Sequence, residues 1–208
     1  MKIFIDLDGT LIDPKLRCYS IYNYLVNGMG YYTYDMDTYW KMKRDKISEE
    51  VIVSKSMPLA YVKYYFEQRF NLIEAMEYLA LDTFFDGVHS VLDKWSINHE
   101  LYIVTLRKNK ANIDSQLKNL DLYKYFTHVY SAHDDKTVVM RNEITNYNDC
   151  IIIGDTEEDI LDGKSIGIRT VAVSSGIRSR RLLAETFPDI LVESICADGL
   201  HNIIDNWR

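Results

Sequence analysis

The sequence predicts an α/β protein built on a doubly wound parallel sheet, with an all-helical segment inserted after the first strand. Three observations support this prediction. Short apolar runs recur along the chain, helical patterns separate most of them, and one long stretch contains helical patterns but no strand pattern. At 208 residues, the chain has room for one α/β domain and a small inserted subdomain.

Five apolar runs are the expected strands of the sheet. Each run is four to six residues long and shows little alternation of polar and apolar residues, which is typical of strands covered on both faces. They span Lys2–Leu7, Glu100–Thr105, Thr127–Tyr130, Asp149–Gly154 and Arg169–Ser174. Near the C-terminus, we expect a short edge strand at Pro188–Val192 and a closing helix at Ser194–Ile204.

Helical patterns lie between the later strands. The expected crossover helices span Lys108–Leu120, Thr137–Thr145 and Glu157–Ile166, and Gly167 after the last of them is a favourable helix end. Because strands that alternate with helices of this kind pair in parallel, the pattern predicts a parallel, doubly wound sheet.

The stretch from residue 15 to residue 81 breaks this alternation. Its apolar spacing predicts helices at Tyr19–Val26, Asp37–Met57 and Leu59–Leu79, with Gly28, Gly30 and Pro58 between them. We therefore expect a core formed by residues 1–14 and 82–208, and a helical subdomain of residues 15–81 inserted after the first strand.

Composition excludes several classes of protein. A net charge of −7 argues against a nucleic-acid polymer as partner, because phosphate backbones attract surfaces rich in Lys and Arg. The three cysteines are far apart and form no CxxC pair, which argues against a disulfide framework or a zinc site and fits a reducing cytoplasm. No signal-peptide pattern or membrane-spanning apolar segment is present, so we expect a cytoplasmic protein with no membrane partner.

Two acids end the first expected strand. Asp6 and Asp8 are two residues apart, and Gly9 after them lets the backbone turn sharply. Such a pair can divide the work of phosphoryl transfer, since one carboxylate attacks phosphorus while the other handles protons, and carboxylates also bind divalent metals. The alternative is a solvated turn, because Asp-Gly is a common turn dipeptide.

A hydroxyl and a lysine follow the next two strands. Thr105 closes the second expected strand and can donate a hydrogen bond to a phosphoryl oxygen, although threonine is also an ordinary strand residue. Lys136 lies after the third strand, where it can neutralise a phosphate and a neighbouring carboxylate. The alternative for Lys136 is an exposed surface lysine.

A second acid pair follows the fourth expected strand. Asp155 lies at the strand end, and Asp159 lies one helical turn later on the same face. For Asp159 the alternative is a capping box with Thr156, which would merely start a helix.

These four signals gain their meaning together, because open α/β sheets bind ligands outside the carboxyl ends of their strands. The chain order of acid pair, hydroxyl, lysine and acid pair resembles the haloacid dehalogenase superfamily of phosphohydrolases. The run Asp6-Leu7-Asp8-Gly9-Thr10-Leu11 resembles its first motif, Thr105 its second, Lys136 its third, and Gly154-Asp155 with Asp159 its fourth. The segment Asp189–Ile204 is similar to the closing strand and helix of the phosphoglycolate-phosphatase-like branch.

The resemblance implies a Rossmann-like sheet of strand order 3-2-1-4-5, and it implies that residues 15–81 form a helical cap that closes over the substrate. It implies Asp6 as the nucleophile and Asp8 as the acid and base. It further implies a Mg²⁺ cofactor bound by Asp6, by the Asp8 backbone carbonyl and by Asp155, with Asp159 acting through water. Thr105 and Lys136 would stabilise the transferring phosphoryl oxygens.

Two departures from the family pattern qualify this assignment. Thr137 follows Lys136 where the family often has proline, which leaves Lys108 and Lys110 as outside candidates for the lysine. Leucine and Arg107 follow Thr105 where the family often has Asn or Gly, so Arg107 is a candidate phosphate-binding residue near the substrate entrance, with a solvated helix start as the alternative. His133 is the histidine closest in sequence to Lys136 and the one we consider for the site.

The function that we expect is Mg²⁺-dependent hydrolysis of a small phosphorylated metabolite through an aspartyl-phosphate. The alternatives are a phosphosugar mutase of the same fold and a non-catalytic binding module, although a module would be expected to lose Asp6 or Asp8. Residues 15–81 carry no motif that selects a substrate, so phosphoglycolate, sugar phosphates, nucleoside monophosphates and pyrophosphate are all candidates.

Overall fold

The computed structural model describes residues 1–132 and 135–207, so His133 lies outside the described residues. The described chain forms two compact units, one of Met1–Asp13 with Phe84–Arg208 and one of Pro14–Thr83. The strands β2 (Ile12–Asp13) and β3 (Thr83–Phe84) pair with each other where the chain passes between the units. No helix among the described residues is long and apolar enough to cross a membrane.

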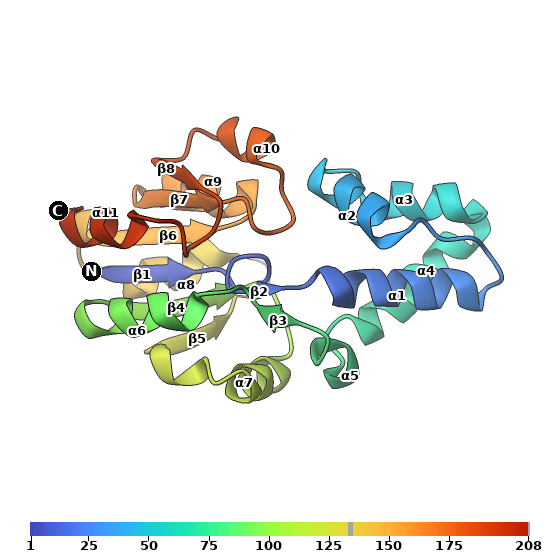
Figure 1. Ribbon diagram of the computed structural model, residues 1–208, viewed down its shortest axis with the longest axis horizontal. Coiled ribbons are helices and arrows are strands. Elements are labelled where there is room, and N and C mark those ends of the chain that lie inside the picture. The colour runs from blue at the N-terminus through green and yellow to red at the C-terminus, as the bar shows by residue number, and fades with distance from the viewer. Residues whose placement is uncertain (133–134, 208) are drawn as a thin grey trace. The chain divides into compact units, whose positions relative to one another are not determined.

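A six-stranded parallel sheet forms the centre of the first unit. Its order is β5-β4-β1-β6-β7-β8, which Figure 1 shows from bottom to top. The strands are β1 (Lys2–Ile5), β4 (Glu100–Thr105), β5 (His128–Ser131), β6 (Cys150–Gly154), β7 (Arg169–Val173) and β8 (Ile190–Val192). All adjacent pairs are parallel. The predicted α/β class and the strand order 3-2-1-4-5 are therefore confirmed, with β8 added at the edge.

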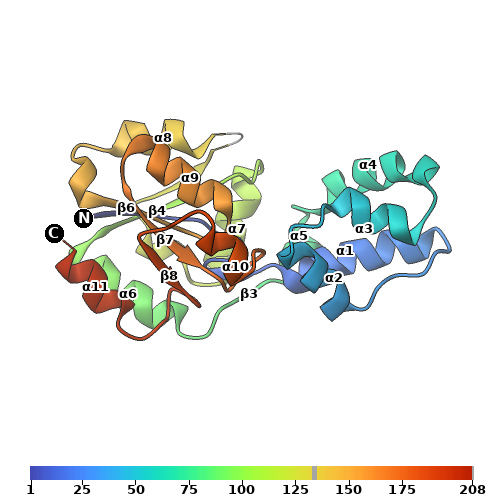
Figure 2. The ribbon, with the colours of Figure 1, turned by 90° about the horizontal axis from the view of Figure 1, so that it is seen from above.

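Helices cover both faces of this sheet. They are α6 (Val88–Asn98), α7 (Lys110–Asn119), α8 (Lys136–Glu143), α9 (Glu157–Ile166), α10 (Arg180–Ala184) and α11 (Leu200–Asn206), with short 3-10 turns η2 (Tyr123–Tyr125) and η3 (Tyr147–Asp149). Figure 2 shows α8 and α9 on one side of the sheet and α6 and α11 on the other.

Alternation along the strands divides the core into two layers. Ile3 and Ile5 of β1 pack in a cluster with side chains of α6, α7 and α11, whereas Phe4 packs in a cluster with Met140 of α8 and Ile166 of α9. Successive strand residues point to opposite faces, so an apolar strand without polar alternation needs helices on both sides. This explains why continuous apolar runs predicted the sheet.

The second unit is built from helices, and its one strand residue is Thr83 of β3. It contains α1 (Lys15–Gly28), α2 (Met36–Arg44), α3 (Glu49–Ser56), a 3-10 turn η1 (Leu59–Tyr61), α4 (Val62–Leu72) and α5 (Met76–Leu79). Its core includes the fully buried rings of Tyr22, Tyr39 and Tyr65. The role of this unit as a cap stays a prediction.

The prediction of two long helices in this unit was wrong, because each expected helix is interrupted in the middle. The expected Asp37–Met57 helix ends at Arg44, where Lys46 takes a left-handed backbone with φ of 63°, and Ser48 then starts α3 by accepting a hydrogen bond from the Val51 amide. The expected Leu59–Leu79 helix is interrupted where Ala75 takes an extended backbone. Apolar spacing continued through both breaks and concealed them.

Buried ionic contacts hold the helical unit together. Arg17 near its beginning and Asp82 near its end form an ion pair of 3.1 Å, and both side chains are almost fully buried. Glu49 accepts hydrogen bonds from the hydroxyls of Tyr39 at 2.9 Å and Tyr65 at 2.5 Å. The ion pair joins the two ends of the unit, and the Glu49 contacts join α2, α3 and α4.

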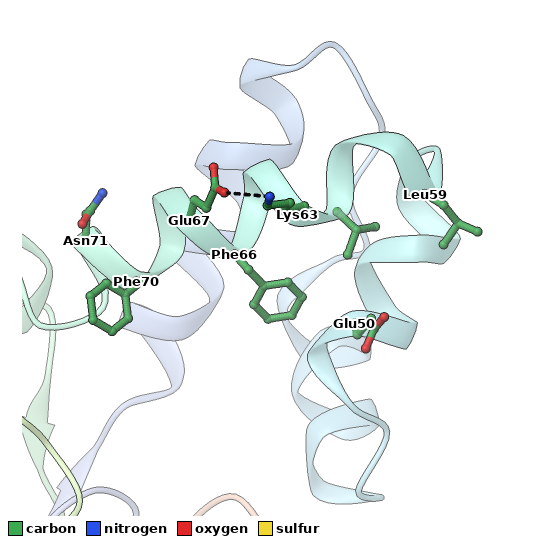
Figure 3. A pocket seen from close by; sticks show the side chains of 8 residues that line it. Glu50, Leu59, Lys63, Phe66, Glu67, Phe70 and Asn71 are labelled. Atoms are coloured by element: carbon green, nitrogen blue, oxygen red, sulfur yellow. Dashed lines mark ion pairs between the residues drawn. The ribbon is translucent and has the colours of Figure 1, made fainter. Parts of the chain in front are cut away.

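An open groove of about 930 Å³ lies on the surface of the helical unit. Leu59, Phe66 and Phe70 contribute to its apolar lining, and Lys63 and Glu67 form an ion pair of 3.9 Å beside it (Figure 3). None of the predicted catalytic residues lines this groove.

Candidate active site

The predicted site residues of the first unit converge at the carboxyl ends of the three central strands. Ile5 of β1 is in register with Ile103 of β4 and with Ile153 of β6, so the three strands end within two residues of one another. Asp6 follows β1 directly and its amide donates to the Ile153 carbonyl at 2.9 Å. Asp155 follows β6 directly, and the buried Thr105 closes β4.

Lys136 joins the nucleophile candidate to the second acid pair. It is the first residue of α8, its side chain is almost fully buried, and its Nζ donates to Asp6 Oδ1 and, at 2.6 Å, to Asp159 Oδ1. The exposed-lysine alternative for Lys136 is therefore wrong. Lys108 and Lys110, the outside candidates, are exposed.

Asp155 lies in a cradle of two glycines. Its Oδ2 accepts from the Ile177 amide at 2.6 Å. A Cβ on Gly9 would come within 2.2 Å of this oxygen and one on Gly176 within 1.9 Å, and Gly9 also has a φ of +84° that favours glycine. Both glycines are therefore needed for the close approach. The loop that carries Gly176 and Ile177 was not identified from the sequence.

The Asp159 carboxylate binds both Lys136 and Thr156. Its Oδ1 accepts from Lys136, while its Oδ2 accepts from the Thr156 hydroxyl at 2.7 Å and from the Thr156 amide at 3.1 Å. The capping box that we considered as the alternative is thus present, and it holds the carboxylate that binds Lys136.

The three buried acids fit a divalent cation. One carboxylate oxygen from each of Asp6, Asp155 and Asp159 lies within 4.8 Å of the others. Asp155 Oδ1 is buried and has no hydrogen-bond partner among the described residues, as expected of a metal ligand. Carboxylate oxygens are the ligands that Mg²⁺ prefers. Both oxygens of Asp159 are occupied, so Asp6 and Asp155 are better placed than Asp159 for direct coordination.

The shifted pKa values of the cluster also favour a divalent cation at this position. Burial raises the pKa of Asp6 to about 7, although Lys136 pulls it down. Burial, with the nearby Asp6 carboxylate, raises the pKa of Asp155 well above its ordinary value. Burial disfavours the charge of Lys136, but the Asp159 and Asp6 carboxylates outweigh this and raise its pKa. Three acids thus share one ammonium, and a divalent cation would offset the remaining negative charge.

The Asp8 carboxylate binds Arg107. Arg107 donates to both of its carboxylate oxygens, from Nε at 2.6 Å and from Nη2 at 2.5 Å. Arg107 is only 7% exposed, and α7 begins at Lys110, so the solvated helix start considered for Arg107 is wrong. Gln116, which accepts from Arg107 Nη1 at 2.5 Å, was not singled out from the sequence.

Comparison with known proteins agrees with this geometry. Residues 3–173 match the model of the family described as haloacid dehalogenase-like hydrolase. The chain is 24% identical to the pyrophosphatase PpaX of Bacillus mycoides over 216 residues, covering 93% of this chain and 92% of the relative. A PpaX of Bacillus cereus is likewise 24% identical over 215 residues, with the same coverage.

Solved structures share the fold. A haloacid dehalogenase-like family hydrolase from Streptococcus pneumoniae superimposes with a TM-score of 0.76 at 22% identity, covering 93% of this chain and 94% of that one. A protein from Clostridium difficile superimposes with a TM-score of 0.78 at 20% identity, covering 98% and 97% of the two chains. With the family model matching most of its length, this chain belongs to the haloacid dehalogenase-like hydrolases.

Proposed function

We propose that the protein is a Mg²⁺-dependent phosphatase that hydrolyses a small phosphorylated metabolite through an aspartyl-phosphate on Asp6. The observation that carries this proposal is the buried contact of Lys136 with Asp6 and Asp159, close to Asp155, whose Oδ1 has no hydrogen-bond partner among the described residues. A carboxylate that can act as a nucleophile, the ammonium of Lys136 and a carboxylate oxygen that can bind a metal therefore support the proposal together. These are the groups that phosphoryl transfer to a carboxylate needs.

In the first half of the reaction, a carboxylate oxygen of Asp6 attacks phosphorus and the bond to the leaving oxygen breaks. Asp8 gives its proton to that oxygen. Lys136 and the Thr105 hydroxyl stabilise the negative charge on the transferring phosphoryl oxygens, and such a stabiliser is typically worth about 10²–10³ in turnover.

In the second half, water attacks phosphorus and Asp8 takes a proton from it, which releases inorganic phosphate and restores the Asp6 carboxylate. Mg²⁺ held by Asp6, by Asp155 and by the Asp8 backbone carbonyl, with Asp159 behind them, would supply positive charge for both halves. Asp159 keeps Lys136 in place throughout.

Pyrophosphate is the substrate to test first, because two relatives covering nearly the whole chain are named pyrophosphatases. Phosphoglycolate, sugar phosphates and nucleoside monophosphates complete the panel. A phosphosugar mutase would instead move the phosphoryl group between two hydroxyls of a sugar without releasing inorganic phosphate.

The decisive experiment measures phosphate release from 4-nitrophenyl phosphate and from this panel. Wild-type protein should be active with Mg²⁺ and inactive with a chelator, and Asp6→Asn should be inactive with its fold intact. Asp198→Asn, which removes an exposed acid elsewhere in the same unit, is the matched control and should behave as wild type. Wild-type turnover in Asp6→Asn would end the proposal.

A further inference from the structure

Arg107 binds Asp8 through both oxygens of the carboxylate. Its Nε donates to Oδ2 at 2.6 Å and its Nη2 donates to Oδ1 at 2.5 Å. A planar guanidinium that contacts both oxygens fixes the plane of a carboxylate as well as its position. Asp8 follows β1 and Arg107 follows the neighbouring β4, so the folded sheet creates this contact between residues far apart in sequence.

Arg107 is itself held by its neighbours. Its backbone amide donates to Thr105 Oγ1 at 3.3 Å, its carbonyl accepts from the Ser131 hydroxyl, and its Nη1 donates to Gln116 Oε1 at 2.5 Å. Contacts from β4 and β5 therefore anchor its backbone, and a contact from α7 anchors its side chain. The Arg107 side chain is 6% exposed, whereas the Asp8 side chain is 28% exposed. A rigid, buried group thus holds a carboxylate that reaches solvent.

We propose that Arg107 is a positioning residue that acts on the reaction through Asp8. This inference rests on the proposed function, in which Asp8 transfers a proton to the leaving oxygen. Without Arg107, Asp8 can rotate about its side-chain bonds, and a misplacement of about 1 Å can cost about 10²-fold in rate. Three guanidinium nitrogens already face protein acceptors, which favours positioning over direct binding of the substrate phosphate.

The test compares aryl phosphates of similar size that differ in how much their leaving group needs a proton. Phenyl phosphate has a poor leaving group, and 2,4-dinitrophenyl phosphate has one that departs without protonation. In Arg107→Met, kcat/KM for phenyl phosphate should fall about 10²-fold, whereas kcat/KM for the dinitrophenyl ester should fall less than about 5-fold. A purely structural defect would lower both values equally.

A double-mutant cycle shows whether Arg107 works through Asp8. Asp8→Asn alone should produce the same dependence on the leaving group. Adding Arg107→Met to Asp8→Asn should then cause no further loss of kcat/KM for phenyl phosphate, because the carboxylate to be positioned is already gone. Arg107→Lys keeps the charge but loses the planar guanidinium that contacts both carboxylate oxygens, so it should recover only part of the rate.

Two outcomes would overturn the inference. One is full additivity of the Arg107 and Asp8 variants, and the other is a rise in KM for both esters with unchanged kcat, which would make Arg107 a phosphate ligand. Thermal melting of each variant confirms that it is folded, and Arg107→Lys serves where Arg107→Met does not fold. Failure of the proposed function is distinct, because it appears as inactive wild-type protein or as active Asp6→Asn.

Discussion

Replacing Asp6 by Asn should stabilise the metal-free protein at neutral and alkaline pH. The Asp6 carboxylate is buried beside Asp155 and Asp159, and burial raises its pKa to about 7 from an ordinary value of 3.8. Between these two values the folded chain keeps a proton that the unfolded chain has released. The folded state binds more protons in this window, so the free energy of unfolding must decrease as pH rises through it.

The size of the effect follows from the width of that window. A difference of one pH unit is worth about 1.4 kcal/mol, so the ionisation of Asp6 costs the folded protein about 4 kcal/mol by pH 8. Asn has nearly the same shape and no charge, so Asp6→Asn avoids this cost. At pH 4, where Asp6 is protonated in the folded protein, the two proteins should have nearly equal stability. At pH 8 the variant should melt roughly 10 °C higher.

The assay is thermal and urea unfolding in chelator-containing buffers from pH 4 to pH 8.5. Asp198→Asn is the control and should follow the wild-type curve. Adding Mg²⁺ should stabilise the wild type much more at pH 8 than at pH 5, and should stabilise Asp6→Asn far less. Parallel pH profiles for wild type and Asp6→Asn in chelator would refute the reasoning, since they would mean that Asp6 ionises as easily in the folded chain as in the unfolded one.

Three further predictions test neighbouring parts of the structure. Lys136→Met should lower turnover about 10²–10³-fold, measured as phosphate release, whereas unchanged turnover would remove Lys136 from the mechanism. Gly176→Ala should abolish the stabilisation by Mg²⁺ in thermal melts, because the added Cβ would overlap the Asp155 carboxylate at 1.9 Å; a retained Mg²⁺ response would contradict this. Asp82→Asn leaves Arg17 without its buried counter-ion and should destabilise the helical unit by about 3–5 kcal/mol. Hydrogen exchange should then be faster in residues 14–83 than in the sheet, and uniform exchange in both units would count against it.

The sheet could be predicted from the sequence because its signals are local. An uninterrupted apolar run such as Cys150–Gly154 is buried on both faces, so its pattern reflects its environment directly. The helix Glu157–Ile166 was predicted with its observed bounds, since Thr156 caps its start and Gly167, with a φ of 78°, ends it. Parallel pairing then brings the strand ends together, and with them Asp6, Thr105 and Asp155.

Features that depend on contacts between distant segments could not be predicted in the same way. Lys46 has a left-handed backbone just after α2, and lysine has no preference for that conformation that the sequence could reveal. The approach of Gly176 to Asp155 joins loops after two different strands. Arg107 was open to two interpretations because its direction is set by Asp8 and Gln116, which come from other elements. In the last two cases the deciding partners come from other elements of the fold.

A crystal structure of the protein with Mg²⁺ and beryllium fluoride would reveal which atom accepts the phosphoryl group. Beryllium should be bound to a carboxylate oxygen of Asp6, with Mg²⁺ beside it on Asp155 Oδ1 and Lys136 still in contact with Asp6. An adduct on any other side chain, or Mg²⁺ bound away from Asp6 and Asp155, would contradict the proposal that Asp6 is the nucleophile of a metal-assisted phosphatase.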